Sequence, residues 1–322
     1  MNEDVEAKNT EQPTLTKTRR VSLAKLTEVY GILVTLSIIW GLAFVAIKIM
    51  EPMVTPVNLT LLRWFIAGGA FLILLPFFGK PRVAIERKDV PRLLLVSFAN
   101  VVAYHLTINY SEGSVGAGLE TLLVALGPIF IVILSTIFLR EKHGRTIYLA
   151  ILLAFAGSLI LFFGTVETGG SGTIPGILEG IGTALSYATF SVFAKPLVQK
   201  FGARATTIWV GLIGTAMLLP LLSGGFVTQV ARLPISGWIA ILYLSLLSTV
   251  FGYMLFYTMI ERGGVAKVSI QLYLVPVVGI AGGALILGES ITEFTIIGGA
   301  TMLLAVGLTT LKSRRVPVSR TN

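Results

Sequence analysis

Five ionisable side chains interrupt long apolar stretches of this sequence, and chemistry could be built on them. They are Lys48, Arg63, His105, Glu120 and Glu179. An ionisable group within an apolar segment of a membrane costs a few kcal/mol, so it usually faces a cavity or a partner. A carboxylate or an imidazole in such a place can exchange a proton or bind a charged ligand.

Glu120 and His105 are the candidates for proton coupling. Glu120 lies in the fourth apolar stretch and His105 in the third, and the short connection makes these stretches neighbours. Glu120 could bind a proton or a substrate ammonium group, or it could form a structural ion pair with Lys48 or Arg63. His105 could relay protons, but we favour a hydrogen bond between helices, because no second histidine lies within a span to extend a relay.

Arg63, Lys48 and Glu179 receive more modest interpretations. We expect Arg63 to extend to the outer lipid headgroups or to pair with a carboxylate, and binding of an anionic substrate is the less favoured alternative. Lys48 lies near the outer end of the first stretch, and Glu179 lies near the start of the sixth, where an interfacial position suffices.

Aromatic and amide side chains also lie within the stretches rather than at their ends. Aromatic belts gather at the membrane interfaces, so aromatic residues deep in a span either pack or line a cavity. A cavity of phenols, amides and a carboxylate suits a small zwitterionic or amphipathic metabolite. The predicted cavity residues are Trp40, Asn100, Tyr104, His105, Glu120, Tyr187, Tyr253, Tyr257, Gln271 and Tyr273.

Ten long apolar runs carry these residues. Because a bilayer core of about 30 Å needs about 20 apolar residues per helix, each run is predicted to be a transmembrane helix. The predicted spans are 28–50, 56–78, 91–112, 115–138, 146–165, 174–195, 204–223, 236–260, 265–287 and 292–312.

Positive charge alternates between the gaps and predicts the orientation. Of the 25 lysines and arginines, 22 fall before the first span, after the last, or in every second gap. Short loops rich in these residues stay cytoplasmic, which places both chain ends in the cytoplasm and the protein in the plasma (inner) membrane. The net charge of +9 is spread over short segments, so it indicates contact with anionic lipid rather than nucleic acid.

Composition argues against most enzyme chemistry. The chain has no cysteine and only two histidines, and it lacks a phosphate-binding Gly-Lys-Ser/Thr motif. We therefore expect no metal, no cofactor and no ATP hydrolysis within this chain, and not an enzyme. Residues 1–27 are polar and are predicted to be a disordered cytoplasmic segment.

The second half of the sequence repeats features of the first. Trp40 and Lys48 have the spacing of Tyr187 and Lys195, and Ala103-Tyr104 matches Gly252-Tyr253. Each half holds five spans, so the second half must enter the membrane from the opposite side. Such inverted repeats are typical of secondary transporters. The predicted units are repeats 28–165 and 174–312, an extracytoplasmic linker 166–173 and a cytoplasmic tail 313–322.

The prolines of spans four and nine occupy matching positions in this repeat. Pro128 precedes the sequence Leu139-Arg140-Glu141, and Pro276 precedes Leu287-Gly288-Glu289 at the same distance. A proline inside a helix frees a carbonyl one turn earlier and allows a bend. We therefore predict that Pro128 and Pro276 are symmetric gate elements.

These features resemble the drug/metabolite transporter superfamily, specifically its EamA type. The resemblance covers residues 28–312 and depends on Trp40-Gly41, Lys48, the two span prolines and the Leu-x-Glu that closes each of those spans. It implies an all-α membrane protein with ten helices in two inverted five-helix repeats. It also implies a central cavity formed mainly by spans 1, 3, 4, 6, 8 and 9, alternating access, and often export of amino acids or other small metabolites.

The expected function is a secondary transporter, an exporter of small amino-acid-like or amphipathic metabolites. A proton-coupled or facilitative importer, or a membrane sensor or scaffold without transport, remains an alternative. A single chain of ten spans can close a cavity, so both a monomer and a homodimer are compatible with the sequence.

Overall fold

The chain is described by a computed structural model that covers residues 23–115, 123–166, 173–265, 268, 271–288 and 291–313. Within these residues every regular element is a helix, and no strand occurs. The all-α fold class predicted from the sequence is therefore confirmed for the described part of the chain. Glu120, Glu289, the segment 1–22 and the tail beyond Ser313 lie outside it.

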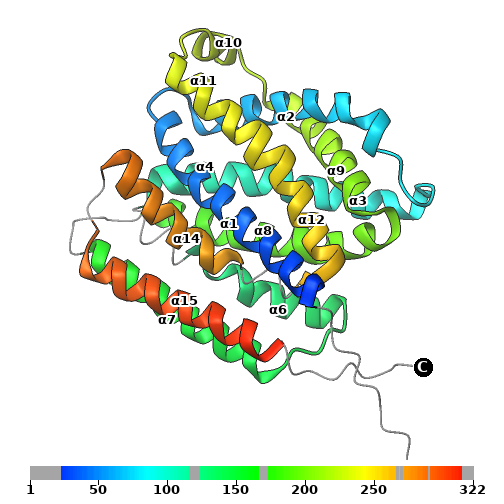
Figure 1. Cartoon of the computed structure of the whole chain (residues 1–322). Helices are drawn as coiled ribbons and strands as arrows, with labels where there is room; N and C mark the ends of the chain where they lie inside the picture. Colours follow the sequence, from blue (N-terminus) through cyan, green and yellow to red (C-terminus); the bar gives the residue numbers. More distant parts are fainter. Residues whose placement is uncertain are drawn as a thin grey trace, which may run out of the picture.

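The helices follow one another with short connections (Figure 1). Those of the first half are α1 (Leu23–Met50), α2 (Pro56–Phe78), η1 (Arg87–Asp89), α3 (Val90–Ser97), η2 (Phe98–Ala103), α4 (Tyr104–Ser114), α6 (Gly127–Phe138) and α7 (Arg145–Val166). Those of the second half are α8 (Ile174–Phe201), α9 (Ala203–Leu218), η3 (Leu219–Leu221), α10 (Gly224–Ala231), α11 (Ile235–Leu242), η4 (Tyr243–Phe251), α12 (Gly252–Gly263), α14 (Gln271–Gly282), η5 (Gly283–Leu287) and α15 (Glu293–Ser313).

Two helix starts show how local sequence sets these boundaries. Thr55 caps α2 by accepting a hydrogen bond from the Asn58 N–H, and proline occupies the first turn. Thr173 caps α8 in the same way through the Gly176 N–H. A hydroxyl cap followed by proline satisfies one free N–H and fixes the backbone for the helix, so both helices begin at the predicted residue.

Among the described residues, six helical segments are long and apolar enough to cross a membrane: 30–50, 56–78, 87–114, 174–201, 203–221 and 235–263. Four shorter apolar helices occupy 127–138, 145–160, 271–287 and 293–305. These ten segments fall on the ten predicted spans, although six alone meet the length required. The short helix α10 was not predicted. The fourth span was predicted to run from residue 115. Val115 is extended, residues 123–124 are helical and a turn at 125–126 precedes α6, while residues 116–122 lie outside the described part of the chain.

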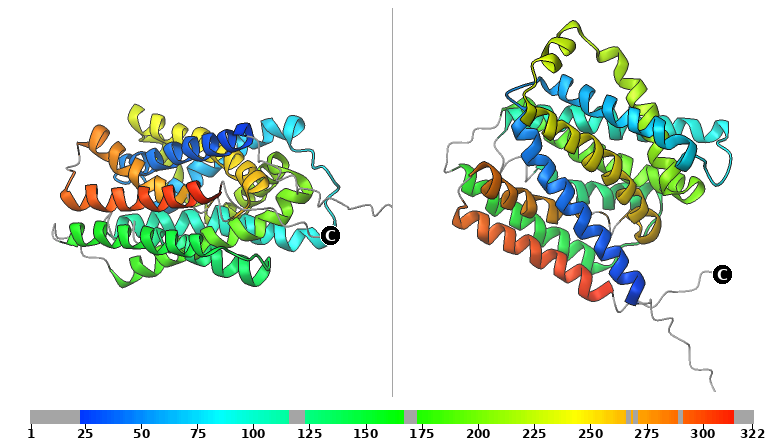
Figure 2. Two further views of the ribbon diagram at one scale, coloured as in Figure 1. Left: turned by 60° about the horizontal axis from the view of Figure 1, so that its bottom comes forward. Right: turned by 45° about the horizontal axis from the view of Figure 1, so that its top comes forward.

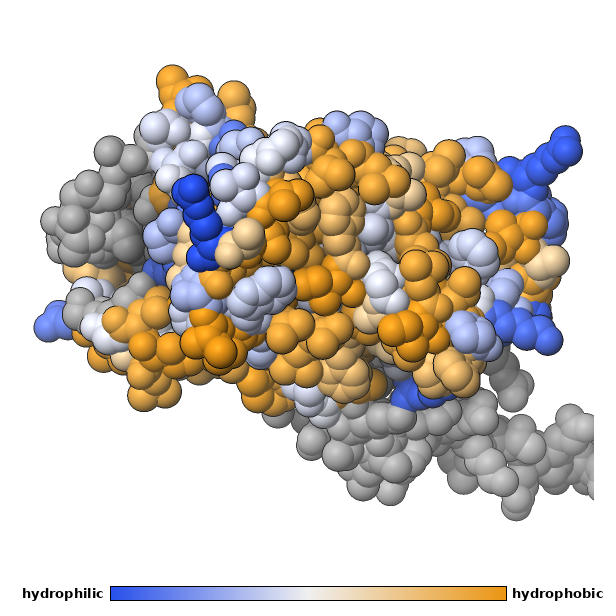
Figure 3. All heavy atoms as spheres, turned by 90° about the horizontal axis from the view of Figure 1, so that it is seen from above, coloured by the Kyte–Doolittle hydropathy of each residue, from blue (hydrophilic) through white to orange (hydrophobic). Residues whose placement is uncertain are grey.

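Apolar side chains cover most of the outer surface. Figure 3 shows hydrophobic residues across the middle of the molecule and hydrophilic residues toward its ends. Large side chains such as Ile73, Phe77 and Leu152 are more than half exposed. A water-soluble protein would bury such residues, so this surface is the one that a multi-pass membrane protein presents to lipid.

Helices of the two halves pack against each other rather than forming separate bodies. α1 lies along α14, and α8 lies along α6; α4 lies along α8, and α1 lies along α12. The remaining large contacts join α2 to α9 and α7 to α15, the latter pair running side by side in Figures 1 and 2. If each span of one half is replaced by the corresponding span of the other half, the set of contacts stays the same. The contact of α1 with α14, for example, becomes that of α8 with α6.

The core between the halves is built on close helix contacts. A Cβ added to Gly41 of α1 would lie 2.5 Å from the Cβ of Val278 on α14. A Cβ on Gly214 of α9 would lie 2.1 Å from a methyl of Val101 in η2. Small residues let membrane helices approach closely, so the Trp-Gly pair of the first span serves packing through its glycine.

Candidate functional site

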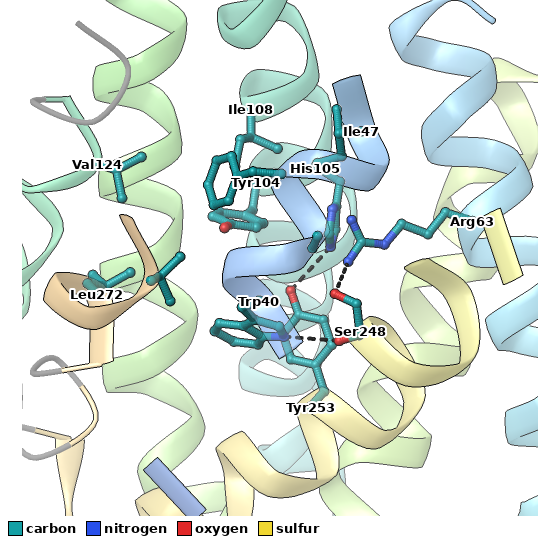
Figure 4. A pocket seen from close by; sticks show the side chains of 13 residues that line it. Trp40, Ile47, Arg63, Tyr104, His105, Ile108, Val124, Ser248, Tyr253 and Leu272 are labelled. Carbon is teal, nitrogen blue, oxygen red and sulfur yellow. Dashed lines mark hydrogen bonds between the residues drawn. The ribbon is translucent and has the colours of Figure 1, made fainter. Parts of the chain in front are cut away.

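A small cavity lies at the centre of the helix bundle, between the two halves (Figure 4). Its volume is about 40 Å³, which gives room for roughly three water molecules. Residues from α1, α2, α4, η4, α12 and α14 surround it, together with Val124, which precedes α6. They are Trp40, Ala43, Phe44, Ile47, Arg63, Tyr104, His105, Ile108, Val124, Ser248, Tyr253, Leu272 and Val275.

Arg63 is the charged residue of this wall. Its side chain is only 5% exposed, and its guanidinium points toward the His105 ring in Figure 4. The Nε–H donates to Oγ1 of Thr249 at 2.7 Å, and an Nη2–H donates to Oγ of Ser248 at 3.0 Å. Two neutral hydroxyls of η4 therefore hold a buried positive charge.

His105 connects the third span to the eighth. Its Nε2 lies 3.2 Å from the hydroxyl of Tyr253, and either atom donates according to the tautomer. Its ring also packs edge-on against Trp64 and Tyr104. The predicted hydrogen bond between helices is confirmed, while a proton-relay role stays a prediction.

Trp40 forms the opposite side of the cavity. Its Nε1–H donates to the carbonyl oxygen of Ser248 at 3.0 Å, so the first span is bonded to the eighth. The ring packs against Tyr253 and Phe256. A Cβ on Gly252 would lie 2.6 Å from the indole nitrogen, which explains why a glycine precedes Tyr253.

Both repeats distort the helix directly before their matched residues. The π-helical segment η2 ends at Ala103, before Tyr104, and the π-helical segment η4 ends at Phe251, before Gly252-Tyr253. π-Helical turns occur frequently at functional sites because they break the regular ladder and redirect side chains. Here η4 presents the hydroxyls of Ser248 and Thr249 to Arg63. The sequence pattern alone does not predict these two hydrogen bonds.

The structure brings together some of the predicted cavity residues and separates others. Trp40, Tyr104, His105 and Tyr253 line the cavity. Tyr187 lies just behind the wall, with its ring 6.4 Å from that of Trp40 and 6.0 Å from that of Tyr104. The sixth span was expected to be a wall of the cavity, whereas none of its residues is among those that line it.

Asn100, Tyr257, Gln271 and Tyr273 are buried away from this wall. Asn100 donates its amide N–H to the Tyr257 hydroxyl at 3.0 Å, joining η2 to α12. Gln271 is fully buried, and Tyr273 packs among small residues of α7 and α15. Their substrate-binding roles stay predictions, as does that of Glu120, which lies outside the described residues.

The two predicted gate prolines occupy different places in their helices. Pro128 lies in the first turn of α6, directly after a turn at Leu126, where a missing N–H costs nothing. Pro276 lies inside α14. The two prolines therefore do not hold equivalent positions in their helices, and the gating role of each residue stays a prediction.

The main residue that the sequence interpretation undervalued is Arg63. Extension to the lipid headgroups is wrong, because the side chain is buried and donates to Ser248 and Thr249. The signal available in the sequence was the position of Arg63, eight residues into an apolar helix that begins at Pro56. A charged side chain at that depth in a membrane helix needs hydrogen-bonding partners within the protein.

Known proteins give the same picture of the chain. The family model for the EamA-like transporter family matches residues 29–163 and 174–311. A transporter of Archaeoglobus fulgidus is 30% identical over 83% of this chain and 93% of its own length. A probable terminal-alkyne amino-acid exporter of Streptantibioticus cattleyicolor is 28% identical over 88% and 94%.

Further matches extend this set. A probable amino-acid metabolite efflux pump of Escherichia coli is 27% identical over 84% of this chain and 90% of its own. One crystal structure aligns with a TM-score of 0.70 at 19% identity, over 90% of this chain and 98% of that one, which shows a shared fold. With both halves matched by one family model and a bundle of apolar helices around a central cavity, the chain belongs to the EamA-like transporter family.

Proposed function

We propose that this protein is a secondary transporter that exports small amino-acid-like or amphipathic metabolites by alternating access. Two inverted five-helix repeats, 28–165 and 174–312, would make ten crossings around the cavity. The single observation that carries this proposal is the cavity itself. Its wall takes Trp40, Arg63 and His105 from the first repeat and Ser248 and Tyr253 from the second, so a rotation of one repeat against the other changes access to it.

The helix contacts support an inverted relationship between the repeats. The contact of the first span with the ninth has its counterpart in the contact of the sixth with the fourth. The contact of the third with the sixth has its counterpart in that of the eighth with the first. A pseudo-twofold axis in the membrane plane produces this exchange.

The charge distribution supports the orientation. The 22 basic residues in alternate gaps and at the chain ends would face the cytoplasm by the positive-inside rule. The first turn of α1 and the last turn of α15 lie at the same end of the molecule (Figures 1 and 2). Segments 1–27 and 313–322 would then be cytoplasmic, and the linker 166–173 extracytoplasmic.

The amino-acid-like substrate class follows relatives named as an amino-acid metabolite efflux pump and an amino-acid exporter. Coupling to protons would use Glu120, with His105 as a second site. Facilitative transport, in which no proton moves with the substrate, would require the cavity but would not require a proton on Glu120 or His105.

Metabolite profiling of the growth medium tests the proposal. Cells that express the wild type are compared with cells that express Glu120→Gln at equal membrane levels. Export predicts that one compound class accumulates outside wild-type cells, and coupling through Glu120 predicts that the variant loses this accumulation. Proteoliposome counterflow with the same compounds supplies the second measurement. Absence of both accumulation and counterflow for the wild type would overturn the transport proposal, and uptake alone would replace export by import.

A further inference from the structure

We propose that Arg63 binds the carboxylate group of the transported molecule, which makes the substrates small carboxylates with an apolar body. This inference rests on the proposed transport function and names the chemistry that its cavity selects. It assigns to Arg63 a role that the sequence interpretation gave only as the less favoured alternative.

Burial of the Arg63 side chain carries an energetic cost. A guanidinium remains charged in proteins, so its burial at 5% exposure has to be compensated by partners. The hydrogen bonds that it makes within the described part of the chain go to Thr249 and Ser248, which carry no charge. Hydroxyls satisfy N–H groups but carry no charge, so among the described carboxylates only Glu112 acts on the guanidinium, through its electrostatic attraction. A bound anion in direct contact would neutralise the guanidinium charge within the cavity.

The guanidinium of Arg63 has further N–H donors besides the two that bond to η4. A guanidinium presents five N–H groups in a planar fork that matches a carboxylate in bidentate fashion. Two of these groups, the Nε–H and one Nη2–H, donate to η4, which fixes the plane of the guanidinium. Because Arg63 itself lines the cavity, the rest of the fork is available to a ligand there.

His105 provides an independent second observation. Its side chain is 1% exposed and lines the cavity beside Arg63. Nε2 is bonded to Tyr253, whereas no described residue bonds to the buried Nδ1. Buried polar atoms normally have a hydrogen-bond partner, and each exception calls for an explanation. Among the buried atoms of the described residues that have none, His105 Nδ1 belongs to a side chain that lines the cavity beside Arg63. In the tautomer with the proton on Nδ1, this N–H would add a further donor for an anion.

The remaining wall defines the body of the substrate. Phe44, Ile47, Ile108, Leu272 and Val275 contribute apolar surface. A ligand that fits would place a carboxylate on Arg63 and an aliphatic or aromatic group against this surface. The present volume of about 40 Å³ admits little more than the charged group, so the cavity has to widen for a whole substrate. This agrees with a cycle that alternates between closed and open states.

A matched set of three probes tests the inference: L-phenylalanine, 3-phenylpropionate and phenethylamine. They share one apolar body and carry both charged groups, the carboxylate alone or the ammonium alone. Binding is measured by thermal stabilisation of the purified full-length protein, and transport by counterflow in proteoliposomes. We expect the two carboxylates to stabilise the wild type and to exchange, and the amine to do neither.

Two variants and one control separate recognition from folding. Arg63→Gln should weaken carboxylate binding about 10- to 100-fold, as expected for loss of a charge-assisted bidentate contact. Arg63→Lys keeps the charge and should recover part of the affinity. Arg232→Gln makes the same change at an exposed position between α10 and α11 and should leave both measurements unchanged. The melting temperature without ligand reports whether each variant is folded.

The outcomes distinguish this inference from the transport proposal. Transport of phenethylamine by the wild type, or carboxylate binding retained within twofold in folded Arg63→Gln, overturns the role of Arg63 and leaves transport standing. Carboxylate binding that depends on Arg63, without counterflow of any probe, supports the site and contradicts transport. If neither carboxylate binds the wild type, the substrate class proposed here is wrong. Should Arg63→Gln fail to fold, Arg63→Lys and the three-probe comparison in the wild type decide.

Discussion

The two ends of the molecule join the repeats by different chemistry. One end, here the basic end, consists of residues 79–89, 139–145, 195–204 and 261–264. There, Arg82 pairs with Glu261 at 2.5 Å, Lys195 pairs with Glu141, and Lys200 pairs with Asp89 at 2.7 Å. Each of these ion pairs connects the first half of the chain to the second.

The opposite end consists of residues 50–58, 111–115, 173–176 and 222–235. Here Gln229 of α10 accepts hydrogen bonds from the Thr55 N–H at 3.0 Å and the Asn58 side-chain amide at 2.8 Å. Ser111 donates to the Gly176 carbonyl at 3.1 Å. These are contacts between neutral groups across the same pair of halves.

The difference indicates how each end can open. Charged groups near water lose little when they separate, because solvent replaces the partner, and such pairs contribute about 0.2–1 kcal/mol each. Several pairs acting together can hold one end closed and still release it. Neutral hydrogen bonds of the opposite end are insensitive to salt. Ionic strength should therefore shift the closure of the basic end selectively.

Reversing one charge at the basic end should give the largest effect. Lys195 and Glu141 are each about one-fifth exposed, so both partners of this pair are more enclosed than Arg82. Because both partners are largely withdrawn from water, this charged hydrogen bond is worth more than an exposed pair, about 1–3 kcal/mol. Glu141→Lys would remove it and bring two ammonium groups together. We expect transport in proteoliposomes to fall at least tenfold and the melting temperature to drop.

The double variant Glu141→Lys with Lys195→Glu restores opposite charges and should recover most of the transport. Glu293→Lys makes the same charge change at an exposed position at the start of α15 and serves as the control. If the control is as damaging as Glu141→Lys, or the double variant shows no recovery, the ion pair does not join the halves in the working protein.

Removal of the Gln229 side chain should have a medium effect at the opposite end. Gln229→Ala leaves the Thr55 N–H and the Asn58 amide without their acceptor, at a cost of about 0.5–1.5 kcal/mol. The melting temperature should fall by the same amount at low and high salt, because no charge is involved. A loss that depends on salt would contradict the contrast between the two ends.

Much of the fold could be predicted because the length of apolar runs, the alternation of charged loops and the residues that begin helices are all local properties of the sequence. Thr55-Pro56 and Thr173 with Pro175 begin their helices where the sequence places them. The internal match of Ala103-Tyr104 with Gly252-Tyr253 pointed to residues that do follow equivalent π-helical segments. Periodicity could not predict those segments, since a π turn depends on packing against distant helices rather than on local propensity.

The site was harder to predict, because burial decides it and burial is a tertiary property. Arg63 could be interpreted as reaching the headgroups until Ser248 and Thr249 were placed 185 and 186 residues away in the chain but at its side. Asn100 and Tyr257 satisfy each other instead of a substrate. Residue type gave the candidates, but only the pairing of the two halves separates wall residues from packing residues.

Loss of a single exposed pair at the basic end should have a small, salt-dependent effect. Arg82 is 61% exposed, although its partner Glu261 also accepts the Ala203 N–H at the start of α9. Arg82→Gln should therefore cost under about 1 kcal/mol. The chain has no cysteine, so a single Ala43→Cys in the cavity wall reports access. Labelling of this thiol from the basic side should rise modestly when Arg82→Gln is added, and high salt should raise it in the single Ala43→Cys variant. Equal labelling under all conditions would show that the Arg82–Glu261 pair does not help to close the basic end.

The smallest effect should come from pH at Glu86. The Lys88 and Lys200 ammonium groups, which lie 2.7 and 3.2 Å away, hold the pKa of the Glu86 carboxyl below its ordinary value of 4.5. A carboxyl with a lowered pKa stabilises the folded protein above its ordinary value, and this contribution disappears as pH falls through the lowered one. The melting-temperature difference between the wild type and Glu86→Gln should thus be constant from pH 8 to pH 6 and vanish only in acid, below 4.5. A difference that already changes near neutral pH would mean that another group controls the basic end, and the ion pairs there would no longer account for its closure.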